Sequence, residues 1–242
     1  MTPDHVRYWE PWPRRMRAIL GGVTVLDSRR GVVLHETGHL PEHYYPVDDL
    51  DPDLLSPAEP TEAGAARWDI GVAGRVAATA VTAYTDPSGA DGGPPLADFV
   101  AVDFAAMDRW FEEDDPVYGH LRDPYHRVDV RASSRRVVVR HQGQVVAESA
   151  RPKLLFETGN PTRYYLPFAD IDLGRLELSD TVSECPYKGD GQHWHLITDG
   201  EPVPDVAWSL PHPLPEGFAA AEHLCFYPNK VDLEVDGEHI TD

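Results

Sequence analysis

The chain reads Leu34-His35-Glu36-Thr37-Gly38-His39 and then Tyr44-Tyr45-Pro46, and 121 residues later it repeats this pattern. The second copy reads Leu155-Phe156-Glu157-Thr158-Gly159-Asn160 and then Tyr164-Tyr165-Leu166-Pro167. The separation holds without a gap from Gly22 and Gly143 to Leu50 and Ile171. Solenoid and propeller repeats span roughly 20–50 residues, so a period of this length predicts a duplicated domain.

Length and composition fit two small globular domains. The chain has 242 residues, of which 41% are hydrophobic and 10% aromatic, so each copy has enough residues for a core of its own. The formal net charge of −20 repels polyanions, and we therefore expect no nucleic-acid and no membrane partner. The N-terminus has no apolar leader, and the only two cysteines suit a reducing compartment. We expect a cytoplasmic protein.

Short strands joined by turns are expected in both copies. With 23 prolines and 19 glycines, the composition favours frequent turns and few, short helices. Gly21-Gly22 lies between two apolar runs and predicts a β-hairpin, and a turn near Gln142-Gly143 predicts its counterpart. Residues 218–224 are the clearest short helical segment, and the alternation over residues 230–235 predicts a closing strand. The predicted fold class is mainly β.

The sequence divides into a lead-in and two domains. Residues 1–13, rich in proline and tryptophan, are expected to form the lead-in, residues 14–130 the first domain and residues 131–242 the second. Trp68 matches Trp194 at a spacing of 126 rather than 121, so the second copy is five residues longer here. The extra length falls around Cys185-Pro186-Tyr187-Lys188-Gly189. Because the linker is short, we expect the two domains to pack on each other, in a monomer or a homodimer.

These motifs resemble the family known as domain of unknown function 427, here in tandem. The shared features are the hairpin ending in Asp27-Ser28 or Glu148-Ser149, the Glu-Thr-Gly motif and the Tyr-Tyr-Pro motif. The second copy adds the 185–189 segment, Trp194 and Ala207-Trp208-Ser209. Residues 122–129 resemble the tail that joins one copy to the next. The resemblance covers nearly the whole chain from about Arg14.

The resemblance implies a compact β-sheet domain, similar to the β-tent (Mss4-like) folds, with no settled activity. The first copy departs from the pattern, because it lacks the Cys-Pro-Tyr-Lys-Gly segment and has Val81-Thr82-Ala83 in place of Ala-Trp-Ser. β-Tent relatives often hold zinc between two Cys-x-x-Cys pairs, which Cys185 and Cys225 alone cannot provide. A nucleotidyltransferase label sometimes given to the family finds no support here, since the chain has neither a P-loop nor a basic triphosphate cradle.

The candidate catalytic residues are Cys185, Lys188 and Glu157. Cys185 and Lys188 lie three residues apart in a turn bounded by proline and glycine, and a nearby ammonium group favours the nucleophilic thiolate form of a cysteine. Glu157 is the candidate base or orienting carboxylate, if the fold brings it there. The alternative is that Cys185 is an inert buried thiol and Lys188 a solvated turn residue.

The candidate ligand-binding residues are mainly aromatic. Ligand pockets combine aromatic walls with a few polar groups, but the aromatic residues of small β domains belong mostly to the core. The repeated glutamate is either a ligand-facing acid or a buried acceptor for a donor such as Arg163 or Arg136, and its presence in both copies favours the structural role. The candidates are Tyr187, Trp194, Tyr165, Tyr164, Arg163, Trp208 and Glu36.

No metal site and no cofactor are predicted. His193 and His195 would point to one face of a strand, but their spacing from Cys185 matches no established zinc pattern. The leading hypothesis is that the second domain, or the cleft between the domains, binds a small polar metabolite, with turnover left open. One alternative is a hydrolase or transferase that uses Cys185. The other is a non-catalytic interaction or scaffold protein, which predicts a large exposed apolar patch.

Overall fold

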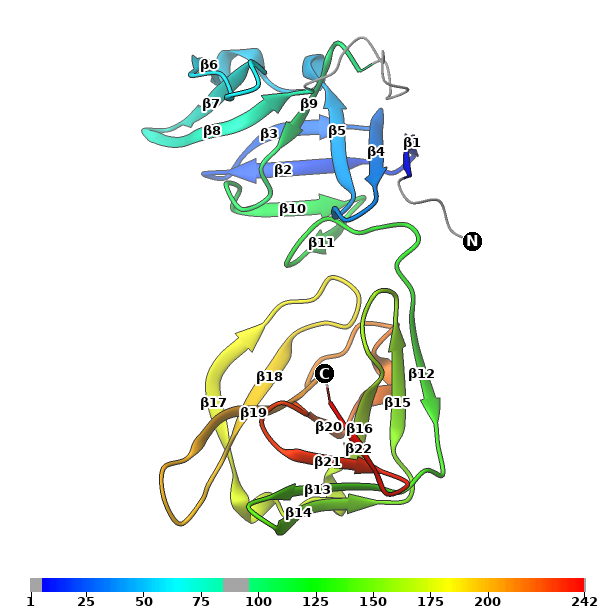
Figure 1. Cartoon of the computed structure of the whole chain (residues 1–242). Coiled ribbons are helices and arrows are strands. Elements are labelled where there is room, and N and C mark those ends of the chain that lie inside the picture. The colour runs from blue at the N-terminus through cyan, green and yellow to red at the C-terminus, as the bar shows by residue number, and fades with distance from the viewer. Residues whose placement is uncertain (1–5, 85–95, 242) are drawn as a thin grey trace. The chain divides into compact units, whose positions relative to one another are not determined.

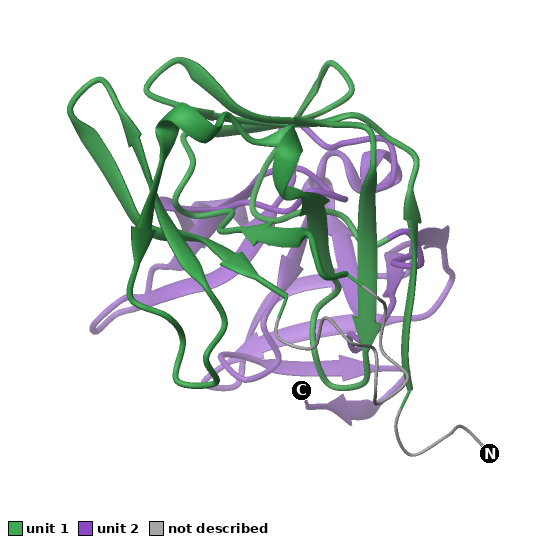
Figure 2. Ribbon diagram, turned by 90° about the horizontal axis from the view of Figure 1, so that it is seen from above, with its two compact units in different colours: residues 1–123 green, residues 124–242 purple. Residues whose placement is uncertain are grey.

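A computed structural model of the chain describes residues 6–84 and 96–241, so the first five residues of the lead-in lie outside the description. The chain forms two compact units, residues 1–123 and residues 124–242 (Figure 2). The described parts contain β-strands and short 3-10 helices but no α-helix, which confirms the mainly β class. None of the helices described is long and apolar enough to cross a membrane.

The first unit consists of a seven-stranded and a four-stranded antiparallel sheet (Figure 1). The strand order is β1-β4-β5-β9-β8-β7-β6 in the larger sheet and β11-β10-β2-β3 in the smaller. The strands are β1 (Arg7–Trp12), β2 (Met16–Leu20), β3 (Val23–Ser28), β4 (Gly31–Glu36), β5 (Glu42–Pro46), β6 (Leu55–Ala58), β7 (Arg67–Val72), β8 (Arg75–Ala83), β9 (Phe99–Val102), β10 (Arg109–Glu112) and β11 (Asp115–Val117). Two 3-10 turns, η1 (Val47–Asp49) and η2 (Pro52–Leu54), connect β5 to β6.

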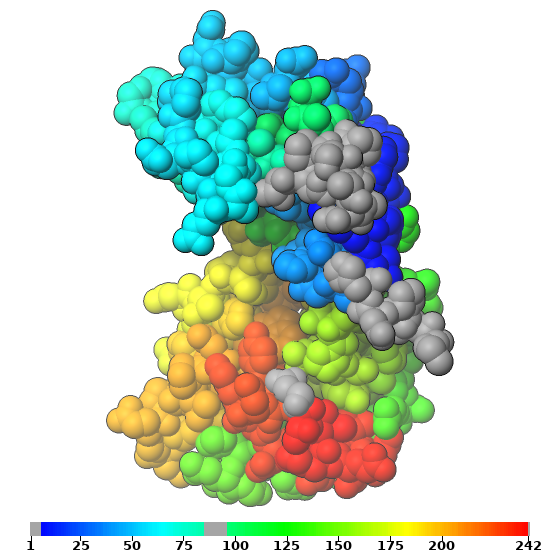
Figure 3. Space-filling model, turned by 45° about the horizontal axis from the view of Figure 1, so that its top comes forward, coloured from blue at the N-terminus to red at the C-terminus, as the bar shows by residue number. Residues whose placement is uncertain are grey.

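The second unit has the same two sheets in the same strand order, β12-β15-β16-β20-β19-β18-β17 and β14-β13-β21-β22. Its strands are β12 (Val128–Ala132), β13 (Val137–His141), β14 (Gln144–Ser149), β15 (Lys153–Glu157), β16 (Arg163–Pro167), β17 (Leu176–Ser183), β18 (Gly191–Leu196), β19 (Val203–Ser209), β20 (His223–Phe226), β21 (Asp232–Val235) and β22 (Glu238–Ile240). The 3-10 turns are η3 (Phe168–Asp170), η4 (Leu173–Arg175) and η5 (Phe218–Ala220). The loop between β18 and β19, orange in Figure 3, projects from the body of this unit.

The predicted duplication is confirmed down to the irregularities of the strands. The hairpin β2-β3 turns at Gly22, its counterpart β13-β14 turns at Gly143, and the two pair in the same register. Their register shifts fall between Ala18 and Ile19 in one copy and between Val139 and Arg140 in the other, which are equivalent positions 121 residues apart. A bulge that recurs at the same place in both copies is a feature of the fold rather than an accident of one copy, since it sets the local twist of both hairpins.

Each unit buries its main core between its two sheets. In the second unit, Val137 and Leu233 of the small sheet pack with Leu166 and Leu224 of the large sheet. Strand alternation places Tyr164 and Leu166 on this side of β16, whereas Tyr165 belongs to a second apolar cluster on the opposite face. The large sheet of each unit therefore has an inner face, which packs on the small sheet, and an outer face.

A repeated hydrogen-bond network explains the Asp-Ser or Glu-Ser part of the shared motif. The Ser149 hydroxyl donates to Asp170 at 2.7 Å and accepts the Arg151 backbone N–H at 3.1 Å. Ser28 makes the same two bonds in the first unit, to Asp49 and from Arg30. These serines and aspartates tie the end of one hairpin to the 3-10 turn that follows the Tyr-Tyr motif. They are structural residues in both copies.

Two local predictions are changed by the tertiary structure. The expected helix at residues 218–224 is reduced to the single turn η5, because His223 already begins β20, which pairs with β16 and β19 in the centre of the sheet. The lead-in is not separate either, since Arg7–Trp12 forms strand β1 and pairs with β4. Its counterpart β12 pairs with β15, which is why residues 124–130 lie with the second unit.

Candidate functional site

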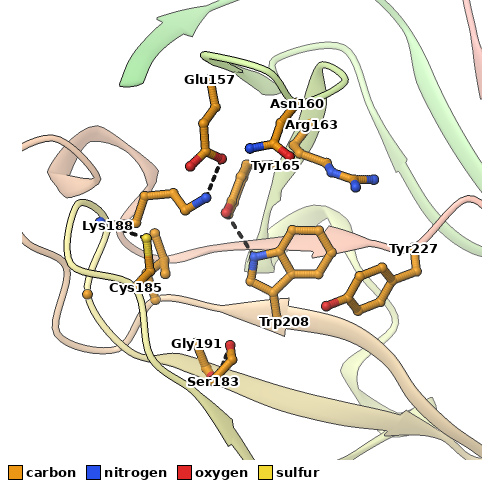
Figure 4. A pocket seen from close by; sticks show the side chains of 12 residues that line it. Glu157, Asn160, Arg163, Tyr165, Ser183, Cys185, Lys188, Gly191, Trp208 and Tyr227 are labelled. Carbon is orange, nitrogen blue, oxygen red and sulfur yellow. Dashed lines mark hydrogen bonds and ion pairs between the residues drawn. The ribbon is translucent and has the colours of Figure 1, made fainter. Parts of the chain in front are cut away.

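A cavity of about 200 Å³ opens on the outer face of the large sheet in the second unit. Tyr165 of β16 and Trp208 of β19 form one wall, and the 185–189 segment borders the cavity from the loop between β17 and β18. Figure 4 shows these side chains converging from strands that are far apart in the sequence. The polar groups at its rim come from Glu157, Asn160, Arg163, Ser183, Cys185 and Lys188.

The 185–189 segment is a tight turn held against the loop that precedes η5. The Gly189 N–H donates to the Cys185 carbonyl at 3.0 Å, and the Lys188 carbonyl accepts the Leu214 N–H at 3.0 Å. Gly189 has a φ of +91°, and a Cβ atom there would lie 2.7 Å from the His212 carbonyl oxygen. Only glycine fits such a conformation at such a distance. This clamp fixes the place from which Lys188 reaches into the cavity.

Lys188, Glu157 and His126 form a partly buried chain of charged and polar groups. The Lys188 ammonium pairs with Glu157 Oε2, and His126 Nε2 lies 3.0 Å from Glu157 Oε1 (Figure 4 draws the first contact). Only 6% of the Glu157 side chain is exposed, against 19% for Lys188 and 17% for His126. Both carboxylate oxygens are thus occupied by protein donors.

The Glu-Thr-Gly motif helps to assemble this chain. The Thr158 hydroxyl accepts the Arg127 N–H at 2.9 Å, and the Thr158 N–H donates to the Arg127 carbonyl at 3.0 Å. These bonds hold the segment before β12 against the end of β15, where it places His126 beside Glu157. The His126 ring also stacks on Tyr187, with ring centroids 4.0 Å apart, so the turn and the His126 segment support each other.

The charge of Glu157 is stabilised by its partners. Burial by itself raises the pKa of the carboxyl, but the hydrogen bonds and charges of Lys188 and His126 outweigh it and hold the pKa below its ordinary value. Glu157 is therefore ionised at neutral pH and cannot act there as a proton donor. Its arrangement favours holding Lys188 in place, and Arg136, one of the two expected partners, pairs instead with Glu148.

Aromatic rings make the wall of the cavity. The Trp208 indole donates to the Tyr165 hydroxyl at 2.9 Å, and burial raises the pKa of Tyr165 well above its ordinary value, so the phenol stays neutral. Tyr227 packs beside Trp208 with ring centroids 4.3 Å apart, and the Arg163 guanidinium lies 5.7 Å from the Trp208 ring. A planar group could therefore stack in this wall next to a cation.

Cys185 lines the cavity, with its sulfur 3.4 Å from the Lys188 backbone nitrogen, which donates to it. The Lys188 ammonium points instead to Glu157 (Figure 4). The lysine therefore offers its backbone N–H to the sulfur and its charge to the carboxylate. Cys225, in contrast, is fully buried in β20.

The structure brings six of the ten predicted site residues to the cavity: Cys185, Lys188, Glu157, Tyr165, Arg163 and Trp208. Tyr187 lies behind them, 3% exposed, against His126. Tyr164 and Trp194 do not reach the cavity, since both pack in the inner core, where the Trp194 indole donates to Ser209 at 3.0 Å. Glu36 belongs to the first unit, where it lies 3.9 Å from Arg7.

Sequence reasoning missed His126, Asn160, Ser183 and Tyr227. Asn160 directly follows the Glu-Thr-Gly motif, and His126 lies in the family-like tail at residues 122–129, so both carried a signal that a closer reading could have used. Ser183 had none; its hydroxyl lies 3.2 Å from His193 Nε2. Among the described residues, no group of three or more His, Cys, Asp or Glu side chains could hold a metal ion.

The first unit carries different side chains at the equivalent positions. Glu42 stands where the second unit has Arg163, and Thr82 where it has Trp208. Tyr44, the equivalent of Tyr165, donates to Glu42 at 2.6 Å and packs edge-on against Tyr84, 5.2 Å between ring centroids. The guanidinium of Arg163 is thus replaced by a carboxylate, and the indole of Trp208 by a threonine.

The fold and site define a tandem β-sheet protein with a polar cavity on the outer sheet face of its second copy. The family described as Domain of unknown function (DUF427) matches residues 8–113 and again residues 129–237. The chain belongs to this family, as two tandem copies, which confirms the resemblance seen in the sequence. No curated protein matches the chain.

Proposed function

We propose that the second unit binds a small polar metabolite in the cavity bordered by Lys188, Glu157 and Trp208. The observation that carries this proposal is the ion pair between Lys188 and Glu157, which is largely buried at the edge of an open cavity. Buried ion pairs often stabilise a fold no better than apolar residues of the same size. The first unit folds with the same topology and without this pair, so the pair is better explained by a ligand than by the fold.

The lining indicates what the ligand carries. Arg163 and Lys188 both bring charged N–H donors to the lining, which favours a ligand with a carboxylate or phosphate group. The ring of Trp208 offers a stacking surface to an unsaturated or planar part. A cavity of about 200 Å³ is small beside the roughly 300–1,000 Å³ of common ligand pockets, so the ligand is a small metabolite.

Thermal-shift screening with small carboxylic and phosphorylated acids tests the proposal. A ligand present at 100 times its Kd stabilises its protein by about 2.7 kcal/mol, which is a measurable rise in Tm. The variant Lys188→Ala should lose that rise, whereas Lys153→Ala, on the same sheet and outside the lining, should keep it. An unchanged affinity in Lys188→Ala would remove the proposal.

A second candidate is covalent chemistry at Cys185, favoured by the position of its sulfur in the cavity and by the N–H donor beside it. It predicts that alkylation at neutral pH modifies Cys185 much faster than Cys225, and that a ligand of the cavity slows it. Mass spectrometry of the two cysteine peptides across pH measures both rates. Equal rates, or no reaction before unfolding, would leave Cys185 a packing residue of a binding site.

A further inference from the structure

The core of the first unit contains polar atoms that the fold leaves without partners. Among the described residues, the side-chain atoms Trp12 Nε1, His43 Nδ1, Tyr45 OH and Glu112 Oε2 are buried and have no hydrogen-bond partner. Tyr45 is 0% exposed, Trp12 3% and His43 4%. An unpaired polar atom in a protein interior is costly, and native structures contain few of them.

These four side chains belong to one cluster. The rings of Trp12 and His43 meet edge-on with centroids 4.9 Å apart, and the centroids of His43 and Tyr45 are 6.5 Å apart. The Arg14 guanidinium lies 4.8 Å from the Trp12 ring and pairs with Glu112 Oε1. The other carboxylate oxygen, Glu112 Oε2, is the atom without a partner. Glu112 is in turn close enough to Tyr45 for its charge to add to burial in raising the pKa of the phenol.

The donors and acceptors of the cluster are mixed. His43 Nε2 lies 3.1 Å from the Arg122 carbonyl, which can only accept, so this nitrogen carries the proton and Nδ1 is an acceptor. Burial lowers the pKa of His43 to about 4, so the ring is neutral at pH 7. Trp12 Nε1 is a donor, Glu112 Oε2 an acceptor, and the Tyr45 hydroxyl can be either.

The second unit shows that the fold does not require this polarity. Leu166 takes the place of Tyr45, and Val235 takes the place of Glu112, and both are fully buried. Two positions of the layer between the sheets are thus apolar in the second copy and polar in the first, while Tyr164 takes the place of His43. A cluster that the topology does not demand points to something bound by it.

We propose that the Trp12–His43–Tyr45–Glu112 cluster is a binding site for ordered water inside the first unit. Water donates two hydrogen bonds and accepts two, so it matches a set that contains one donor, two acceptors and one group of either kind. An anion would meet the Glu112 carboxylate, and a cation could not accept the Trp12 N–H. The water joins β1 and β5 of the large sheet to β10 of the small one.

The variant Tyr45→Phe tests this site through the sign of its effect. If water bridges the cluster, this variant lowers the Tm, because the remaining groups lose a shared partner. Combined with Trp12→Phe, which also removes side-chain volume from the core, it should cost less than the sum of the two single variants. If the cluster is dry, removing an unpaired hydroxyl from the core leaves the Tm unchanged or raises it, and that result overturns the proposal.

Two controls make the result specific. Tyr164→Phe changes the equivalent layer of the second unit, and its effect should add to that of Tyr45→Phe without coupling, since the two positions share no water. A high-resolution crystal structure of the whole chain should show ordered density within hydrogen-bonding distance of Tyr45 OH and at least one of the other three atoms. Density at none of them would contradict the site.

Discussion

The two units share the same strand order and the same two sheets, yet the polar cluster of the first unit lies between its sheets and the polar cavity of the second lies on the outer face of its large sheet. The second unit has a mainly apolar layer between its sheets and a charged cavity on its outer face, with Lys188 and Glu157 at the rim. The first unit has the polar Trp12–His43–Tyr45–Glu112 cluster between its sheets, and Tyr44 and Tyr84 pack on its outer face. Duplication preserved the backbone, and the side chains of each copy then diverged.

The comparison separates residues of the scaffold from residues of the site. What occurs in both copies, such as the serine–aspartate network of the hairpins, holds the fold together. What occurs in one copy only, such as the 185–189 segment, is not needed to form the sheets. Glu157 belongs to both groups: its counterpart Glu36 lies at the same strand end but is 33% exposed, against 6% for Glu157.

The largest effect is expected from breaking the ion pair of the second unit. Glu157→Gln leaves the ammonium of Lys188 without its counter-charge in a partly buried place, and should cost about 3 kcal/mol of unfolding free energy. Glu36→Gln in the first unit should cost less than about 1 kcal/mol, because its contact with Arg7 is longer and more exposed. Urea unfolding of both variants measures the difference. An equal loss of unfolding free energy in the two variants would mean that the two glutamates contribute equally to the stability of the fold.

Acid should destabilise the two units in different pH windows. The pKa of His43 is lowered from 6.5 to about 4 by burial, so the unfolded chain binds a proton in this range and the native first unit does not. Its stability should be full above pH 6.5 and fall by on the order of 3 kcal/mol as the pH drops to about 4. His43→Gln keeps a donor for the Arg122 carbonyl and should remove this dependence.

The second unit should respond at lower pH. The pKa of Glu157 lies below its ordinary value of 4.5, so the stabilisation by Lys188 and His126 is present above pH 4.5 and is lost as the pH falls through the native pKa. Amide hydrogen exchange at a series of pH values can follow each unit separately. Unfolding of both units in one step near pH 6 would contradict the assignment of the two pH windows to His43 and Glu157.

The next effect concerns the clamp of the 185–189 turn. Gly189→Ala places a Cβ 2.7 Å from the His212 carbonyl, whereas Gly159→Ala, also at positive φ, meets nothing within 4 Å. Both variants should carry the cost of a left-handed alanine, about 1–2 kcal/mol. Gly189→Ala should lose about 1–3 kcal/mol more, because the backbone of residues 212–214 that its Cβ meets cannot move away easily. Thermal unfolding compares the two, and an equal loss would mean that the clamp is loose.

The smallest effect should be the same in both copies. Ser28→Ala and Ser149→Ala each remove a buried hydroxyl that bonds an aspartate, and each should cost about 1 kcal/mol. Neither variant should change binding at the cavity, because both serines lie in the scaffold. Chemical denaturation gives the two values. A cost confined to one copy would show that the shared network is not equally important in the two units.

The repeat made most of the fold predictable from the sequence. Glycine turns and alternating strands are local signals, and the 121-residue spacing transferred each assignment from one copy to the other. The short helix at residues 218–224 failed because pairing of His223 with β16 outweighs a local preference that only tertiary structure can test. Strand alternation showed that Tyr164 and Tyr165 face opposite ways, but not which of them faces the core.

The site was harder to predict, because its contacts are distant in sequence. Cys185 and Lys188 stood out in a segment that one copy lacks. The pairing of Glu157 with both Lys188 and His126, each 31 residues away, depends on the order of strands in the sheet. Trp194 shares the same strand as residues near the cavity, and its inward orientation follows from the register of β18 with β19. These contacts and orientations can be known only once the order of strands in the sheet is known.

The most direct test of the central claim is an NMR titration that observes the tryptophan side-chain N–H signals. The chain has six tryptophans, and Trp208 is the one whose indole bonds Tyr165 at the cavity. When small carboxylic or phosphorylated acids that raise the Tm are added, the Trp208 signal should move while those of Trp12 and Trp110 in the first unit stay in place. A bound ligand that shifts the first-unit signals and leaves Trp208 unchanged would contradict the account.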